Sequence, residues 1–101
     1  MNVIADLTVV PIGVGVSLSR YVAACEDVLK QTDLKTTLHP NGTAIEGDWD
    51  AVMAAVKACH ERVHELGAPR IFTTLKIGTR IDRKQTLEEK VDSVKAKQQG
   101  D

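Results

Sequence analysis

Two long segments alternate apolar residues with other residues, and this period of two predicts β-strands. The first segment runs from Val3 to Ile12, and the second runs from Arg70 to Thr79. Two shorter strands are predicted over residues 34–38 and 43–47, because the Pro40-Asn41-Gly42 segment between them has the residues typical of a hairpin turn. The pattern therefore predicts four strands.

Helical spacing of apolar residues predicts two long helices between these strands. Ser17 or Ser19 is expected to cap the first helix, and Asp48 is expected to cap the second. The two apolar stripes are Leu18, Tyr21, Val22, Cys25, Val28 and Leu29, and then Trp49, Val52, Met53, Val56, Cys59, His60 and Val63. The Thr86-Leu87-Glu88-Glu89 capping box predicts a short third helix, and residues 97–101 are expected to form a frayed tail.

The order of these elements predicts an α+β fold, the ferredoxin-like βαββαβ sandwich, over residues 1–96. Two helices would cover one face of a four-stranded antiparallel sheet, with the short C-terminal helix added at the end. The other face would carry Ile4, Asp6, Thr8, Val10, Lys35, Thr37, Phe72, Thr74 and Lys76. Such a mixed face is expected to bind a second copy of the chain or a ligand.

Length and charge narrow the classes of function. A chain of 101 residues is expected to form one domain. Its 13 basic and 14 acidic residues give a net charge of -1, which provides no long-range attraction for nucleic acid or for an anionic membrane. Neither nucleic acid nor a membrane is therefore an expected partner.

The cysteines and the N-terminal segment predict a cytoplasmic protein. Asp6 and Pro11 interrupt the apolar run from Val3 to Val16, so the run predicts neither a signal peptide nor a spanning helix. Cys25 and Cys59 are the only cysteines, and each lies on the apolar stripe of a predicted helix. Two buried thiols are typical of a reducing compartment.

Glu46 stands in the middle of a predicted strand, where a half-buried carboxylate is disfavoured unless it has a partner. One interpretation is that the side chain points to water or pairs with a lysine of a neighbouring strand, such as Lys76. The other interpretation is that Glu46 is the polar anchor of a ligand pocket.

The His60-Glu61-Arg62-Val63-His64 segment matches the H-E-x-x-H pattern of zinc proteases. Arg70 stands where one zinc protease class has its third histidine, and arginine does not bind zinc. We therefore expect no metal site, and we interpret His60 as a histidine at the edge of the core that is hydrogen-bonded to a neighbour.

Three parts of the chain carry weaker sequence signals for anion binding. The Gly13-Val14-Gly15 turn precedes a helix but lacks the remaining residues of a phosphate-binding motif, and a plain turn is the preferred interpretation. Arg20 and Asn41 invite comparison with acylphosphatases, although the order of glycines and arginine differs from that family's loop. The charged loop at residues 80–84 is expected to be solvated, with binding of a phosphate or of a partner subunit as alternatives.

RNA-recognition modules share this element order and bind bases by stacking them on aromatic residues of the open sheet face. In this chain Phe72 is the only aromatic residue that would lie on that face, so we set this interpretation aside.

Several short segments together resemble the small thiamine-binding protein family, which was long described only as a domain of unknown function. They are Pro11-Ile12-Gly13, Ser17-Leu18-Ser19, Tyr21-Val22, Gly42-Thr43, Ile45-Glu46-Gly47, His60-Glu61, Arg70-Ile71, Lys76-Ile77-Gly78-Thr79-Arg80 and Asp82. The resemblance covers nearly the whole chain. It implies a ferredoxin-like subunit that forms homodimers or homotetramers through its sheets, and some relatives bind thiamine or its hydroxymethylpyrimidine portion.

The expected function is therefore non-enzymatic binding of a small pyrimidine-type ligand by a homo-oligomer, with no catalytic residues and no cofactor. An aminopyrimidine has a ring nitrogen and an exocyclic amine that one glutamate and nearby hydroxyl groups can bind. The expected ligand-binding residues are Glu46, Thr43, Thr8 and Asp6, with Ser17 and Ser19 added if the pocket opens at the first helix. The alternatives are a small hydrolase of acyl phosphates and an oligomer with only a structural or regulatory role.

Overall fold

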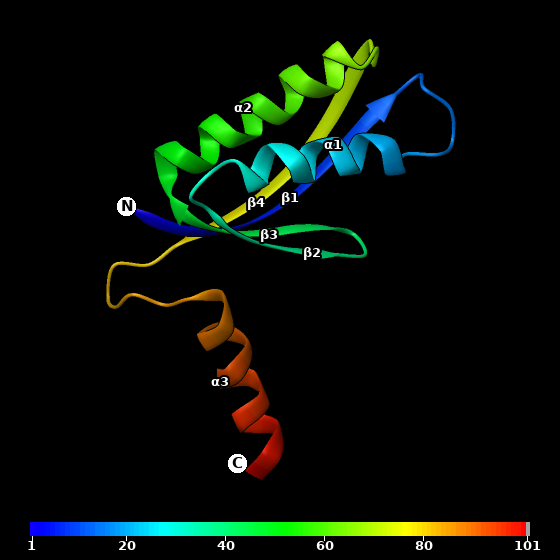
Figure 1. The fold of residues 1–101 in the computed structure, drawn as a ribbon. Coiled ribbons are helices and arrows are strands. Elements are labelled where there is room, and N and C mark those ends of the chain that lie inside the picture. The colour runs from blue at the N-terminus through cyan, green and yellow to red at the C-terminus, as the bar shows by residue number, and fades with distance from the viewer. Residues whose placement is uncertain (101) are drawn as a thin grey trace.

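The computed structural model describes residues 1–100 and contains the predicted elements in the predicted order. They are β1 (Asn2–Ile12), α1 (Ser19–Lys30), β2 (Lys35–His39), β3 (Gly42–Asp48), α2 (Trp49–Glu65), β4 (Arg70–Thr79) and α3 (Leu87–Gly100). The four strands form one antiparallel sheet in the order β2-β3-β1-β4. Helices α1 and α2 lie over one face of the sheet, and α3 lies on the other side (Figure 1). The ferredoxin-like α+β prediction is confirmed.

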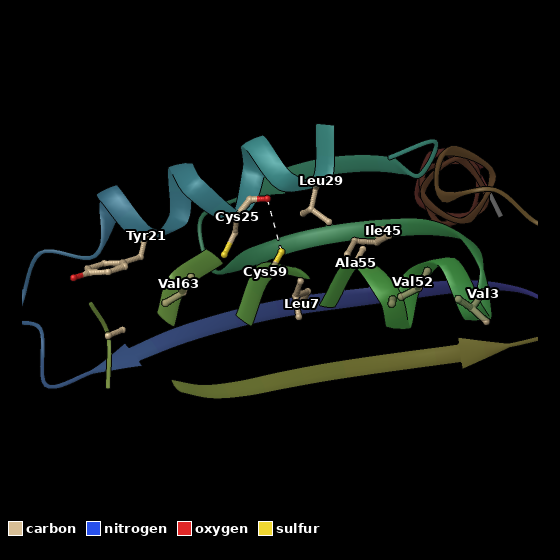
Figure 2. Close-up of a cluster of buried hydrophobic side chains, with 12 residues drawn as sticks. Val3, Leu7, Tyr21, Cys25, Leu29, Ile45, Val52, Ala55, Cys59 and Val63 are labelled. Atoms are coloured by element: carbon tan, nitrogen blue, oxygen red, sulfur yellow. Dashed lines mark hydrogen bonds between the residues drawn. The ribbon is translucent and has the colours of Figure 1, made fainter. Parts of the chain in front are cut away.

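The hydrophobic core lies between the sheet and the two helices α1 and α2 (Figure 2). Alternate residues of β1 and β3 point into it, because successive side chains of a strand point to opposite faces. The core residues are Val3, Ala5, Leu7, Tyr21, Cys25, Leu29, Ile45, Val52, Ala55, Cys59, Val63 and Ala68. These aliphatic side chains pack α1 and α2 against the sheet, and their burial stabilises the fold.

The two cysteines meet inside this core. Both are free and buried, and the Cys59 thiol donates a weak hydrogen bond to the carbonyl oxygen of Cys25, 3.8 Å away (Figure 2). The hydrogen bond with Cys25 and the burial of the sulfur raise the pKa of the Cys59 thiol. Cys59 is therefore a neutral packing group, as expected for a buried thiol.

The open face of the sheet, the one opposite α1 and α2, carries the residues that the alternation predicts. Asp6 lies between Ala44 of β3 and Lys76 of β4, and Val10 lies opposite Phe72. Val10, Ile12 and Phe72 remain exposed, Phe72 to 64%. The open face therefore combines charged groups near its centre with uncovered apolar side chains toward one end.

Two of the predicted helix starts are confirmed and one is wrong. The Asp48 carboxylate accepts a hydrogen bond from the amide of Asp50 at 3.1 Å. Thr86 and Glu89 form the reciprocal capping box, with distances of 3.1 and 3.4 Å. Helix α1 instead has Leu18 at its N-cap position with no side-chain cap, so neither Ser17 nor Ser19 caps it.

Helix α3 is longer than predicted and projects from the domain (Figure 1). Residues 97–100, expected in a frayed tail, are helical, because the lysines, glutamines and alanine that precede Gly100 favour helix. Asp101 lies outside the described residues. The radius of gyration, 15.2 Å, exceeds the value of about 13 Å expected for a compact domain of this length. None of the helices within residues 1–100 has the length and apolar character needed to cross a membrane.

Candidate functional site

The predicted ligand-binding residues divide between the two faces of the sheet. Asp6, Thr8 and Glu46 are on the strand positions of the open face, whereas Thr43 points toward α1. Residues 43 and 46 of one strand differ by an odd number, so their side chains leave the sheet in opposite directions. The structure therefore does not bring Glu46 and Thr43 together in one pocket.

Glu46 lies between Ile4 of β1 and Lys35 of β2. Lys76 is not its neighbour, because Lys76 lies opposite Asp6 on the far side of β1. The Lys35 ammonium forms a hydrogen-bonded ion pair with Glu88 of α3, and this hydrogen bond raises the pKa of Lys35. One carboxylate oxygen of Glu46, Oε1, is buried without a hydrogen-bond partner among the described residues. Of the two interpretations of Glu46, the one that pairs it with a lysine therefore does not hold for Lys76, and the lysine on the neighbouring strand is Lys35.

Asp6 has a protein partner on the open face. Its Oδ1 atom lies 2.5 Å from His39 Nε2, and the other ring nitrogen, Nδ1, accepts a hydrogen bond from the Asn41 amide at 3.2 Å. In the neutral imidazole this arrangement places the proton on Nε2, where it is donated to Asp6. The pair holds the hairpin turn against β1.

The β2–β3 turn approaches β1 closely at Gly42. A Cβ atom at this position would lie 2.7 Å from the Leu7 carbonyl oxygen and 2.8 Å from Thr8 Oγ1. Contacts this short require glycine. The close approach allows the Thr8 hydroxyl to donate a hydrogen bond to the Asn41 carbonyl oxygen at 2.8 Å.

A cleft of about 280 Å³ lies between α1 and this turn, and we call it the helix–hairpin cleft. Pairing of β1 with β3 ends at Leu7 and Thr43, while β1 continues beside β4 to Ile12, so one edge of β1 is uncovered here. The lining residues include Thr8, Leu18, Val22, Cys25, Glu26, Leu38, Asn41 and Thr43. Ser19 and Ala23 extend the depression along α1.

Glu26 and Thr43 are the hydrogen-bonded polar pair of the helix–hairpin cleft. The Thr43 hydroxyl, which is buried, donates to Glu26 Oε1 at 2.5 Å. Leu18, Val22 and Leu38 supply apolar surface around them. A carboxylate and a hydroxyl placed among aliphatic side chains can orient a ring that carries hydrogen-bonding nitrogens.

Sequence reasoning missed Glu26, although its spacing carried a signal. Leu18, Val22 and Glu26 are separated by four residues each, so they share one face of α1. Thr43 is 17 residues away along the chain, and the hydrogen bond between them depends on how α1 packs on the sheet. Of the predicted residues, Thr43 and Ser19 lie at the cleft, and Thr8, although it occupies an open-face position of β1, also lines it beside Asn41. Asp6 and Glu46 lie on the open face away from the cleft, and Ser17 lies in the exposed loop before α1.

The other candidate motifs are engaged in structural contacts. His60 Nε2 lies 2.5 Å from the Thr73 hydroxyl, and His64 Nδ1 lies 2.8 Å from the Ala68 carbonyl oxygen. The interpretation of His60 as a hydrogen-bonded histidine at the core edge is confirmed. Asn41 lines the helix–hairpin cleft, but Arg20 does not, since its guanidinium lies over the Tyr21 ring at 5.6 Å.

Comparison with known proteins gives consistent matches over nearly the whole chain. The family model described as "Thiamine-binding protein" matches residues 5–95. A UPF0045 protein of Synechocystis is 66% identical over 93% of this chain and 78% of the relative. A UPF0045 protein of Eremothecium gossypii is 43% identical over 96% of this chain and 93% of the relative.

Solved structures share the fold. A hypothetical protein of Methanocaldococcus jannaschii has a TM-score of 0.88 and 35% identity, and the match covers 93% of this chain and 96% of that protein. A structure described as a candidate thiamine biosynthesis/salvage protein of Thermotoga maritima has a TM-score of 0.80, 23% identity, and coverage of 93% and 99%. At 23% identity, the match to the Thermotoga maritima protein shows only that the two chains share a fold.

Proposed function

Because the chain belongs to the thiamine-binding protein family, we propose that it binds thiamine through the aminopyrimidine ring, in the helix–hairpin cleft and without catalysing a reaction. The observation that carries the proposal is the Glu26–Thr43 pair among apolar side chains. Among the described residues, Thr43 donates a hydrogen bond to Oε1 of the Glu26 carboxylate and none to Oε2. The Oε2 atom is therefore available to a ligand. The ring nitrogen and exocyclic amine of an aminopyrimidine fit these acceptors.

The charge of the helix–hairpin cleft also supports this class of ligand. Glu26 is a carboxylate, and no lysine or arginine is among the residues that line the cleft in the described part of the chain. Thiamine carries a positive charge on its thiazolium ring, and an acidic cleft attracts a cation and repels an anion. The same charge disfavours hydrolysis of acyl phosphates, which are anions, at this place.

A thermal-shift screen tests the proposed ligand. We expect thiamine and its hydroxymethylpyrimidine half to raise the apparent melting temperature, because a ligand that binds the native state stabilises it by about 2.7 kcal/mol at a concentration of 100 times Kd. The thiazole half, which lacks the aminopyrimidine, serves as the matched control and should shift it less. Absence of a shift with both thiamine and the pyrimidine half at millimolar concentration would contradict the proposal.

We also propose that the protein works as a homo-oligomer in the cytoplasm. Support for assembly comes from the exposed apolar residues of the open face, Val10, Ile12 and Phe72. Further support comes from α3, where the apolar side chains of Val91 and Val94 are 53% and 58% exposed. Apolar surface of this kind is stabilised by contact with another copy. The two free thiols, Cys25 and Cys59, support a reducing compartment.

Light scattering tests the assembly. At micromolar concentration we expect a mass well above the 11.0 kDa of one chain. Phe72→Glu should lower the mass, because it places a charge in the apolar part of the open face. Val16→Glu is the matched control, since Val16 is fully exposed in the loop before α1. A monomer mass for the unmodified protein would refute the proposed oligomer.

A further inference from the structure

A second cavity lies at the opposite end of β1 from the helix–hairpin cleft. It has a volume of about 310 Å³, and its floor includes Ile4 of β1 and Gly78 of β4, which face each other in the sheet. A Cβ atom at Gly78 would contact only the Ile4 carbonyl oxygen, at 3.9 Å, so the glycine leaves this floor open. Arg80, Arg83, Lys84 and Lys90 contribute to its walls, and we call it the basic pocket.

The loop that forms one wall is held by Arg80. Its guanidinium donates two hydrogen bonds to the Asp82 carboxylate, at 2.6 and 2.7 Å, and a third to Gln85 Oε1 at 3.0 Å. The hydrogen bonds from Arg80 lower the pKa of Asp82 to about 2, so the carboxylate stays ionised at neutral pH. A bidentate pair of this kind fixes the orientation of both groups. It therefore orders the turn that carries Arg83 and Lys84.

The remaining cations of the basic pocket have no carboxylate partner. Within residues 1–100, the ion pairs include none of the three remaining cations, Arg83, Lys84 and Lys90. The nearby glutamates are engaged elsewhere, Glu88 with Lys35 and Glu89 with the backbone of Thr86. Three cations thus converge on one cavity in a chain whose net charge is -1. Like charges repel, and a bound anion relieves this repulsion.

We propose that the basic pocket binds the phosphate group of a small phosphate ester. Guanidinium and ammonium groups form charge-assisted hydrogen bonds with phosphate oxygens, and the partly exposed apolar side chain of Ile4 offers surface to the organic part of the ester. The volume lies at the lower end of the range of small-molecule sites, about 300–1,000 Å³. The basic pocket shares no lining residue with the helix–hairpin cleft, so the two sites are independent.

Amide NMR of the 101-residue chain tests this site, with inorganic phosphate as the probe and sodium chloride holding the ionic strength constant. We expect saturable shifts at residues 78–85 and the start of α3. The double variant Arg83→Gln/Lys90→Gln should weaken the binding about tenfold or more, because two charge-assisted contacts are lost. Lys57→Gln, which removes an exposed cation from α2, is the matched control and should bind phosphate like the unmodified protein.

The outcomes separate a built site from general attraction by charge. Shifts that do not saturate, or that persist equally in the double variant, would overturn the proposal. A well-dispersed spectrum of the double variant shows that it is folded, so a loss of binding is not a loss of structure. Phenyl phosphate should bind at least as tightly as inorganic phosphate, and weaker binding would exclude an ester as the ligand. Thiamine itself carries no phosphate, so failure here leaves the thermal-shift result unaffected.

Discussion

Replacing Glu26 with Gln is expected to lower the affinity for thiamine about ten- to a hundredfold. The substitution preserves the size of the side chain but removes the charge from the acceptor of the proposed aminopyrimidine contact. A hydrogen bond to a charged group contributes about 1.5–3 kcal/mol, which corresponds to this loss in affinity. Isothermal titration calorimetry of the unmodified protein and the Glu26→Gln variant with thiamine measures the change.

The fold should survive Glu26→Gln. The amide oxygen of glutamine can still accept the hydrogen bond that the Thr43 hydroxyl donates to Glu26 Oε1. Glu26 is also only partly buried, so the change opens no cavity in the core. A circular dichroism melt close to that of the unmodified protein checks this expectation.

Glu46→Gln is the matched control, because it makes the same chemical change on the opposite face of the sheet. Glu46 is the residue that the sequence predicts as the ligand anchor, and its buried Oε1 atom has no hydrogen-bond partner among the described residues. If the ligand lies in the helix–hairpin cleft, Glu46→Gln should leave the affinity unchanged. Loss of binding in Glu46→Gln with retention in Glu26→Gln would instead place the ligand on the open face and refute the cleft.

Truncation of Ile45 should produce the largest loss of stability. Ile45 is fully buried at the centre of β3, between the sheet and the helices (Figure 2). Ile45→Ala removes apolar contacts and leaves a cavity that the close-packed neighbours fill only partly, and such changes cost about 2–5 kcal/mol. The free energy of unfolding, obtained from urea denaturation followed by circular dichroism, measures the loss.

Ile81→Ala is the control for this prediction. It makes the same substitution at a side chain that is 97% exposed in the loop after β4, so it should change the free energy of unfolding by no more than about 0.5 kcal/mol. Equal effects at the two positions would contradict the described placement of Ile45. In an oligomer the comparison is made at one protein concentration, because association adds to the apparent stability.

Local patterns in the sequence were sufficient for most of the fold. The alternation in Val3–Ile12 and Arg70–Thr79 predicts both the strands and the face that each side chain occupies, because the strand repeat is two residues. Asp48 and Thr86 act within three residues of their partners, so their caps are also predictable. The same alternation separates Thr43 from Glu46, and the prediction that they act together neglected it.

Tertiary structure decided which residues meet. Lys35, and not Lys76, is the neighbour of Glu46, because strand order and register are determined by pairing across the whole sheet. Glu26 reaches Thr43 only when α1 packs over β3, and Arg83 and Lys90 line one cavity only when α3 returns to the open face. A local pattern determines the direction of a side chain relative to its own element. The distance between two elements depends on the packing of the complete core, for which no short segment carries the information.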